Sequence, residues 1–179
     1  VGGLALLTLV ASWEQGHGRL TELRAPHYYA LGRLLLAFTS FWAYVAYFQF
    51  MIIWIANRPT EGAWFLQRQS DSWRDVSLAL IIGHFAVPFL VLLSYRIKRE
   101  RRWLGLVAAW LVLFHFVDIY WLVMPACSPQ AFRPDWPDLA ALLAVGGSAT
   151  IFARFLLRSH PLLAVGDPLL QAALDYESR

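Results

Sequence analysis

Four long apolar segments, separated by short polar connections, dominate the chain. We predict membrane-spanning helices at about residues 29–56, 73–95, 103–123 and 139–157, because a helix needs about 20 apolar residues to cross the hydrocarbon core of a bilayer. Tryptophan and tyrosine side chains lie near the ends of these segments, as is typical of spans whose ends reach the lipid headgroups. The pattern predicts an all-α integral membrane protein with four full transmembrane helices in an up-down bundle, together with the end of a preceding helix.

The chain begins with a short apolar stretch, VGGLALLTLVAS, ahead of the first predicted span. This stretch is too short to cross a membrane, and no basic region precedes it, which argues against a signal peptide. We expect it to be the end of a helix that begins upstream. The predicted organisation is a helix end and cytoplasmic connection at residues 1–26, a four-helix transmembrane bundle at 27–160 and a cytoplasmic tail at 161–179.

The composition supports a membrane location. Hydrophobic residues make up 59% of the chain and charged residues 15%, whereas a soluble domain has roughly 45–50% apolar and about 25% charged residues. The single cysteine, Cys127, excludes an internal disulfide framework and a cysteine-rich metal site. The sequence shows no nucleic-acid motif and no glycine-rich phosphate loop, so we expect the lipid bilayer rather than a nucleic acid as the surrounding partner.

A basic turn sets the expected orientation. The string YRIKRERRW, residues 95–103, places five basic residues and one glutamate between the second and third spans. Cytoplasmic loops of membrane proteins carry an excess of lysine and arginine. The turn is therefore predicted to be cytoplasmic, and an even number of crossings from there places the C-terminal tail in the cytoplasm as well.

Three ionisable residues interrupt the middle of the second and third spans. His84 lies twelve residues before Arg96, and His115 lies twelve residues after Trp103, so both are about 18 Å from the basic turn at 1.5 Å per residue. Asp118 follows one turn beyond His115 on the same helix face. A carboxyl at this depth is either protonated or paired with a cation such as a histidine, and both states suit proton exchange. Because burying such groups in a membrane is costly, these three are the leading site candidates.

The second span also contains a proline close to His84. Pro88 has no backbone N–H, so it leaves a carbonyl of the preceding turn without its helix partner. Inside a membrane, a water molecule or a side chain must satisfy that carbonyl. We therefore expect a polar contact to the backbone near His84.

The first span carries a stripe of hydroxyl groups. Ser40, Tyr44 and Tyr47 are spaced four and three residues apart, which places them on one face of a helix. If this stripe turns inward, its hydroxyls join His84 and the third span in a line of groups that can pass protons or bind a carbonyl ring. Alternatively, the tyrosines pack as ordinary aromatic residues and the histidines are satisfied core residues.

Two further functions are compatible with the same residues. His84 and His115 at equal depth could ligate a haem b in a quinone-reactive membrane anchor, although adjacent helices packed at about 8–10 Å leave little room for a porphyrin. The polar groups could instead only lock the helices of a structural scaffold, at roughly 0.6 kcal/mol per interhelical hydrogen bond.

Three strings carry a resemblance to a known family: SFWAYVAYFQFMIIWIANRP, VSLALIIGHFAVPFLVLLSYRIKR and LVAAWLVLFHFVDIYWLVMPA. Together, across residues 27–126, they resemble the C-terminal half of the F subunits of bacterial alternative complex III, which are related to the polysulfide-reductase (NrfD-like) membrane subunits. The resemblance implies a subunit of a respiratory quinol:cytochrome c, or quinol:acceptor, oxidoreductase in the bacterial cytoplasmic (inner) membrane. The loop NRPTEGAW is less acidic than the family pattern, which leaves the outer mouth of any proton path undefined.

The resemblance also implies which chemistry belongs to this chain and which to its partners. Such a complex oxidises menaquinol or ubiquinol and passes electrons through iron–sulfur clusters and c-type haems on other subunits, so this chain would bind no cofactor of its own. The implied partners are an NrfD-like C subunit, an iron–sulfur subunit and c-type cytochrome subunits. The chain would be a non-catalytic or proton-translocating subunit, with a candidate quinone-binding or proton-conducting role for His84 in GHF and for His115 and Asp118 in HFVD.

Overall fold

The computed structural model describes residues 1–69, 71–128, 132–158, 163 and 166–177. The described residues are helical, with no strand among them. Four helical segments are long and apolar enough to cross a membrane: Ala25–Ala56, Ser72–Leu93, Arg101–Ala126 and Trp136–Leu157. The prediction of an all-α, multi-pass membrane protein is therefore confirmed.

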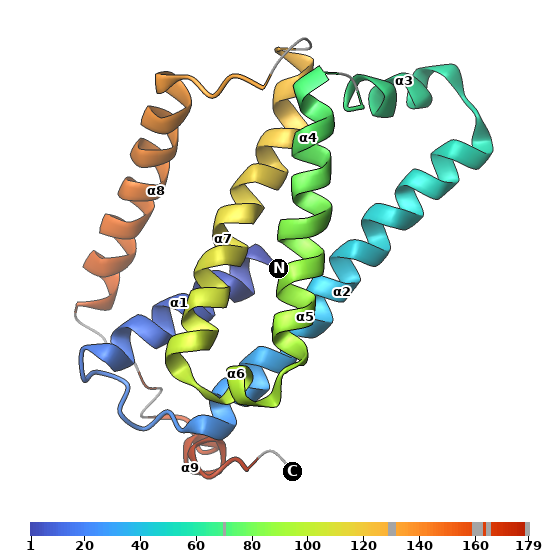
Figure 1. The fold of residues 1–179 in the computed structure, drawn as a ribbon. Coiled ribbons are helices and arrows are strands. Elements are labelled where there is room, and N and C mark those ends of the chain that lie inside the picture. Colours follow the sequence, from blue (N-terminus) through green and yellow to red (C-terminus); the bar gives the residue numbers. More distant parts are fainter. Residues whose placement is uncertain (70, 129–131, 159–162, 164–165, 178–179) are drawn as a thin grey trace. The chain divides into compact units, whose positions relative to one another are not determined.

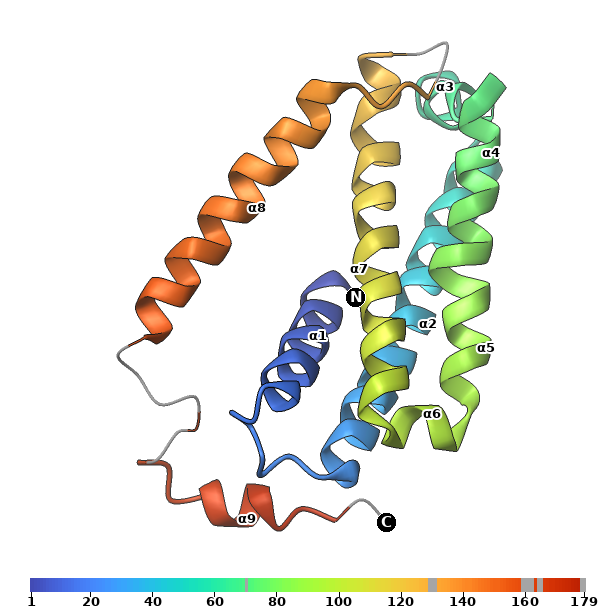
Figure 2. The ribbon, with the colours of Figure 1, turned by 60° about the vertical axis from the view of Figure 1, so that its left-hand side comes forward.

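The chain divides into two compact units, and the first contains three of these spans. It comprises Val1–Phe132 together with the end of the chain from Glu177. Within it, α2, the rod formed by α4, η1 and α5, and α7 run up and down beside one another, and α1 lies against α7 (Figures 1 and 2). The elements are α1 (Gly2–Gly16), α2 (Ala25–Ala56), α3 (Pro59–Gln67), α4 (Asp71–Ala79), the π-helix η1 (Leu80–Ala86), α5 (Val87–Leu93), α6 (Tyr95–Arg99), α7 (Arg101–Val123) and the 3-10 turn η2 (Met124–Ala126).

The second unit, Arg133–Tyr176, contains α8 (Trp136–Leu157) and the short α9 (Leu170–Leu174). Asp135 begins α8 as its N-cap, and its backbone N–H donates to the Asp138 carboxylate at 3.0 Å. Of the predicted tail, residues 161, 162, 164, 165, 178 and 179 lie outside the described residues. The predicted domain boundaries at residues 26 and 160 stay a prediction.

The core of the first unit forms where α1 meets the three spans. Small residues allow this close approach: a Cβ added to Gly105 of α7 would lie 3.3 Å from the Cβ of Ser12 in α1. Between membrane helices, van der Waals packing of this kind replaces the hydrophobic effect as the source of association. The buried residues of this core are Ala5, Tyr28, Leu35, Leu92, Leu104 and Leu111.

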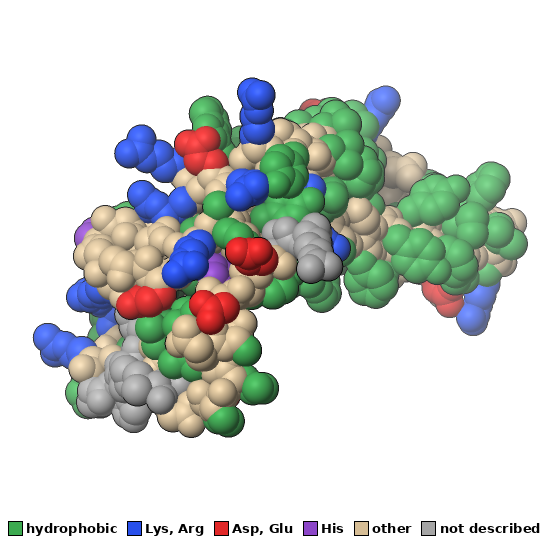
Figure 3. All heavy atoms as spheres, turned by 90° about the horizontal axis from the view of Figure 1, so that it is seen from below, with side chains coloured by type: hydrophobic (Ala, Val, Ile, Leu, Met, Phe, Trp, Pro, Cys, Tyr) green, Lys and Arg blue, Asp and Glu red, His purple; other side chains and the backbone are tan. Residues whose placement is uncertain are grey.

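The basic turn around α6 holds three helices together at one end of the unit. Arg101 donates a hydrogen bond to the Ser12 carbonyl of α1 at 2.7 Å. Lys98 packs its stem against α2, where a Cβ on Gly32 would fall 2.7 Å from the lysine Cγ, and its ammonium lies 5.3 Å from the Tyr29 ring centroid. Seen from below, the surface exposes several lysine and arginine side chains, with aspartate and glutamate side chains among them (Figure 3).

The second span does not continue as a regular α-helix but passes through a π-helical turn. In η1 the N–H of Val87 donates to the carbonyl of Ile82, five residues earlier. Pro88 follows and has no N–H to offer in the same register, so the Gly83 carbonyl is left for another donor. The Trp110 indole N–H of α7 fills that role at 2.7 Å, which is the polar contact expected near His84. Such π-helical turns often occur at functional sites.

The contact beside this turn gives a first prediction. A Cβ added to Gly83 would fall 2.1 Å from Cζ of Phe114, so Gly83→Ala must push α7 away or reshape the π-helix. Overpacking of this kind costs typically about 1–3 kcal/mol, and we expect Gly83→Ala to lower the thermal unfolding midpoint of the detergent-solubilised protein. Gly62→Ala in α3 is the matched control, since a Cβ there meets nothing within 4 Å. Equal midpoints for the two variants would contradict the close packing at Gly83.

Candidate functional site

Four side chains from three spans meet inside the first unit. Trp42 comes from α2, His84 from η1, and His115 and Asp118 from α7. The Trp42 ring stacks on His84 with 4.3 Å between centroids and 30° between planes, and its indole N–H donates to an Asp118 carboxylate oxygen at 3.1 Å. The His84 and His115 rings are 6.4 Å apart, centre to centre. The structure thus brings together the two histidines and the aspartate, which the number of residues from the basic turn had placed at similar depths.

The site is shielded from its surroundings, yet several of its polar atoms have no partner. His84 is fully buried, and Asp118 is 7% exposed. Within the described part of the chain, both ring nitrogens of His84 and the Nδ1 of His115 lack a hydrogen-bond partner. Leaving a buried polar atom unpaired is costly, and such atoms in native proteins call for an explanation.

Helix α1 closes the site on the side of His115. A Cβ added to Gly2 would lie 2.1 Å from Cδ2 of the His115 ring. The histidine is therefore packed directly against a helix backbone, and its exposure is intermediate rather than open. Its ring has little room to turn on that side.

The hydroxyl stripe of α2 does not join this cluster, so the condition for a line of hydroxyls that reaches His84, an inward-facing stripe, is not met within this unit. Tyr44 and Tyr47 are 58% and 64% exposed, and the Ser40 hydroxyl donates to the Leu36 carbonyl of its own helix at 2.9 Å. The face of α2 that turns inward includes Thr39, which is fully buried, and Trp42. The stripe is displaced from this face because successive residues of a helix differ by about 100° in direction.

A buried arginine that the sequence did not reveal closes the other end of α7. Arg68, the C-cap of α3, is 2% exposed. Its guanidinium donates to the carbonyls of Trp121 and Leu122, at 3.2 and 2.7 Å, and to the carbonyl of Trp64 at 3.0 Å. It also lies 3.5 Å from the Trp64 ring centroid and 5.3 Å from that of Trp121.

The partners of Arg68 are carbonyl dipoles and aromatic faces rather than a carboxylate. The carbonyls of the last turn of α7 carry the negative end of the helix dipole and favour a cation there. Burial lowers the pKa of the Arg68 guanidinium, but an arginine stays charged in proteins. Among the described residues, no carboxylate forms an ion pair with it, so it presents a positive charge inside this end of the unit.

A short hydrogen-bond chain links Arg68 to α7 one turn beyond Asp118. The Trp121 indole N–H donates to the Ser77 hydroxyl at 2.8 Å, and that hydroxyl is 3.0 Å from the Arg68 carbonyl. These hydrogen bonds join α3 and α4 to the end of α7.

No protein-family model matches this chain, and no curated protein matches it. The functional assignment accordingly depends on the residues and their geometry. Among the residues that the structure describes, no group of three or more His, Cys, Asp or Glu side chains could hold a metal ion. The imidazoles and the carboxyl of the site are groups that can exchange protons and form hydrogen bonds.

A haem b does not fit between the two histidines as they are packed. Trp42 covers one face of His84, Gly2 lies against His115, and Gly83 contacts Phe114 where the second and third spans meet. A porphyrin ligated by both imidazoles would have to occupy this filled space. The haem-binding alternative is not supported by the packing.

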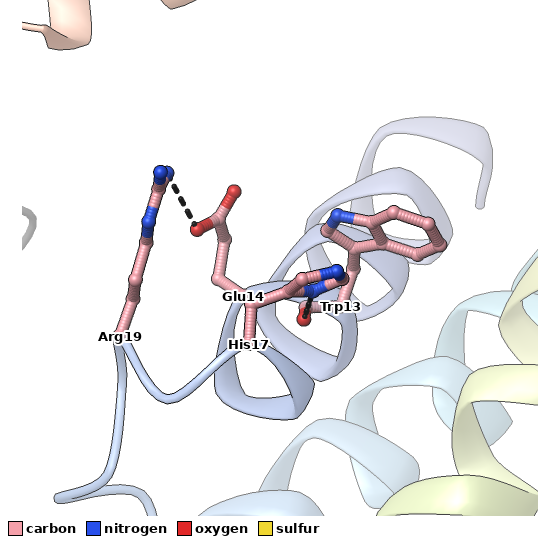
Figure 4. Close-up of polar contacts among 4 residues, drawn as sticks. All are labelled: Trp13, Glu14, His17 and Arg19. Atoms are coloured by element: carbon pink, nitrogen blue, oxygen red, sulfur yellow. Dashed lines mark hydrogen bonds and ion pairs between the residues drawn. The ribbon is translucent and has the colours of Figure 1, made fainter.

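A second polar group lies at the end of α1, away from the site (Figure 4). Arg19 and Glu14 form an ion pair at 3.2 Å, while the His17 Nδ1 is 2.9 Å from the Trp13 carbonyl and its ring lies 4.7 Å from the Trp13 ring. Arg19 is 60% exposed, and such surface pairs contribute little to stability. This group completes the turn after α1 and is not a candidate site.

Proposed function

We propose that this chain is an integral membrane subunit of a respiratory quinol-oxidising complex, in which Asp118, His84 and His115 transfer protons within the bilayer. The observation that carries the proposal is the buried Asp118 beside two histidines, of which both ring nitrogens of His84 and the Nδ1 of His115 lack partners in the described part of the chain. Ionisable residues buried in membrane spans commonly serve proton relays. The resemblance of GHF and HFVD to alternative complex III supplies the kind of complex.

Each residue of the site has a distinct task in this proposal. Asp118 accepts and releases the proton, and the Trp42 indole N–H fixes the direction of its carboxylate. His115, one turn earlier on α7, and His84, on the neighbouring span, are the next stations. Because their ring centres are 6.4 Å apart, transfer between them uses a bridging water or a small rotation of one ring. Imidazole suits this task because one ring nitrogen can donate a hydrogen bond while the other accepts one.

The proposal also assigns partners and orientation. Electron transfer would belong to an iron–sulfur subunit and c-type cytochrome subunits, with an NrfD-like C subunit alongside, and menaquinol or ubiquinol would be the substrate of the whole complex. The basic turn at residues 95–103 and the C-terminal tail would face the cytoplasm of a bacterium, because lysine and arginine are enriched in cytoplasmic loops.

The test is to purify the tagged chain from its native membranes in a mild detergent and to analyse what accompanies it. We expect co-purifying subunits with the absorption spectrum of c-type haem, bound iron and sulfide, and quinol-dependent reduction of cytochrome c. An unrelated multi-pass protein with the same tag serves as the control. Recovery of the chain without any redox subunit would contradict its assignment to a quinol-oxidising complex.

A further inference from the structure

An apolar groove runs along the outside of the first unit, between α5 and α7, and ends at the basic turn. Its volume is about 220 Å³. The side chains that line it are apolar or aromatic, and among them Trp103 and Leu106 are 53% and 61% exposed. The indole N–H of Trp110, also in the lining, is already bonded to the Gly83 carbonyl. The groove therefore offers an apolar surface, and the Trp110 indole has no N–H left to donate to a ligand.

Two arginines of the turn, each next in sequence to a residue that lines the groove, have no bonding partner among the described residues, whereas the other cations of the turn are engaged. Lys98 lies over Tyr29, Arg99 over Tyr95, and Arg101 donates to Ser12. Arg96 and Arg102, in contrast, are exposed and form no hydrogen bond, ion pair or ring contact with another described residue. They directly precede Ile97 and Trp103, which line the groove.

We propose that the groove and these two arginines form a binding site for an anionic phospholipid. One acyl chain lies along α5 and α7, and the headgroup phosphate binds Arg96 and Arg102. Basic pockets beside membrane spans bind anionic headgroups in this way, and free guanidinium groups suit a phosphate because they donate in a planar fork. The site is independent of the proposed role in quinol oxidation.

The shape and chemistry of the groove argue against two other occupants. A transmembrane helix of a partner is about 10–12 Å across with its side chains, so it could cover the groove but could not lie within a volume of about 220 Å³. A quinone ring needs hydrogen-bond donors for its two carbonyl oxygens; of the two indole N–H groups in the lining, that of Trp110 is already bonded to the Gly83 carbonyl, which leaves only that of Trp103. An acyl chain requires neither the width nor the donors.

The test measures lipid retention by the full chain, purified with its accompanying subunits, using native mass spectrometry after incubation with phosphatidylglycerol or phosphatidylcholine. Each arginine near an anionic headgroup contributes about fivefold in affinity, so we expect the wild type to prefer phosphatidylglycerol by about 25-fold. The double variant Arg96→Gln/Arg102→Gln is expected to lose this preference. Arg58→Gln, which removes an arginine paired with Glu61 beyond the far end of α2, is expected to keep it.

Two further experiments distinguish the contribution of the acyl chain to binding from that of the headgroup. Leu106→Trp should fill the groove and reduce retention of both lipids, and soluble glycerol 3-phosphate should not displace phosphatidylglycerol. Equal retention of the two lipids by the wild type, an unchanged preference in the double variant, or displacement by glycerol 3-phosphate would each overturn the proposal. Preferential retention of a menaquinone analogue over phosphatidylglycerol would overturn it as well.

Discussion

Replacing Asp118 with asparagine is expected to reduce proton movement coupled to quinol oxidation by about 10²-fold or more, the typical contribution of a group that transfers protons. Asparagine has nearly the same shape as aspartate, and its amide oxygen can accept the hydrogen bond that the Trp42 indole now donates to the carboxylate at 3.1 Å. It cannot ionise. The substitution therefore removes the proton acceptor while leaving the contact between α2 and α7 in place.

The measurement is quinol oxidation and proton release by the whole complex in liposomes, with assembly checked on a native gel. Trp42→Phe is a matched variant, because it retains a ring against His84 but removes the donor to Asp118, and we expect it to slow proton release less than Asp118→Asn. Tyr44→Phe changes a side chain that is 58% exposed and should have no effect. If Asp118→Asn assembles and moves protons like the wild type, Asp118 only holds helices together and the chain is a scaffold.

The spans and the meeting of the two histidines were predictable because each follows from a simple constraint. A membrane-spanning helix is recognised in a sequence by about 20 consecutive apolar residues. The four predicted segments correspond to the four observed ones. His84 and His115 come together because a short turn joins their helices, so equal numbers of residues from the turn give equal depth. The 6.4 Å between their rings is the result.

The inward face of α2 could not be predicted in the same way. Lipid and protein interior are both apolar, so the sequence of a membrane helix gives little contrast between its two sides. The hydroxyls of Tyr44 and Tyr47 suggested an inward stripe, yet Thr39 and Trp42 occupy that face. Trp42 was overlooked because a tryptophan in a span is usually an ordinary packing or interfacial residue.

The role of Arg68 could not be predicted from the sequence for a different reason. Its site consists mainly of backbone carbonyls and aromatic rings contributed by α3 and α7, and backbone groups leave no signature in a sequence. Along the sequence it is one of several charged residues between the first and second spans. The spacing of Trp64 and Arg68, four residues apart, is the one local signal that places a cation over an aromatic ring.

Arg68→Ala is expected to destabilise the first unit by about 3 kcal/mol or more, because hydrogen bonds to a charged group contribute about 1.5–3 kcal/mol each and the guanidinium also stacks on Trp64. The variant leaves the carbonyls of Trp121 and Leu122 without their donor. We expect a lower thermal unfolding midpoint in detergent. Arg74→Ala, which removes an exposed arginine of α4, should unfold like the wild type.

Arg68→Lys separates the charge of this residue from its geometry. Lysine keeps the positive charge but lacks the planar fork that reaches three carbonyls at once, so its unfolding midpoint should lie between those of Arg68→Ala and the wild type. If the charge also repels protons, liposomes containing the complex should show a faster passive proton leak with Arg68→Ala than with Arg68→Lys. Equal leaks in two variants that both assemble would mean that Arg68 only fastens α3 to the end of α7.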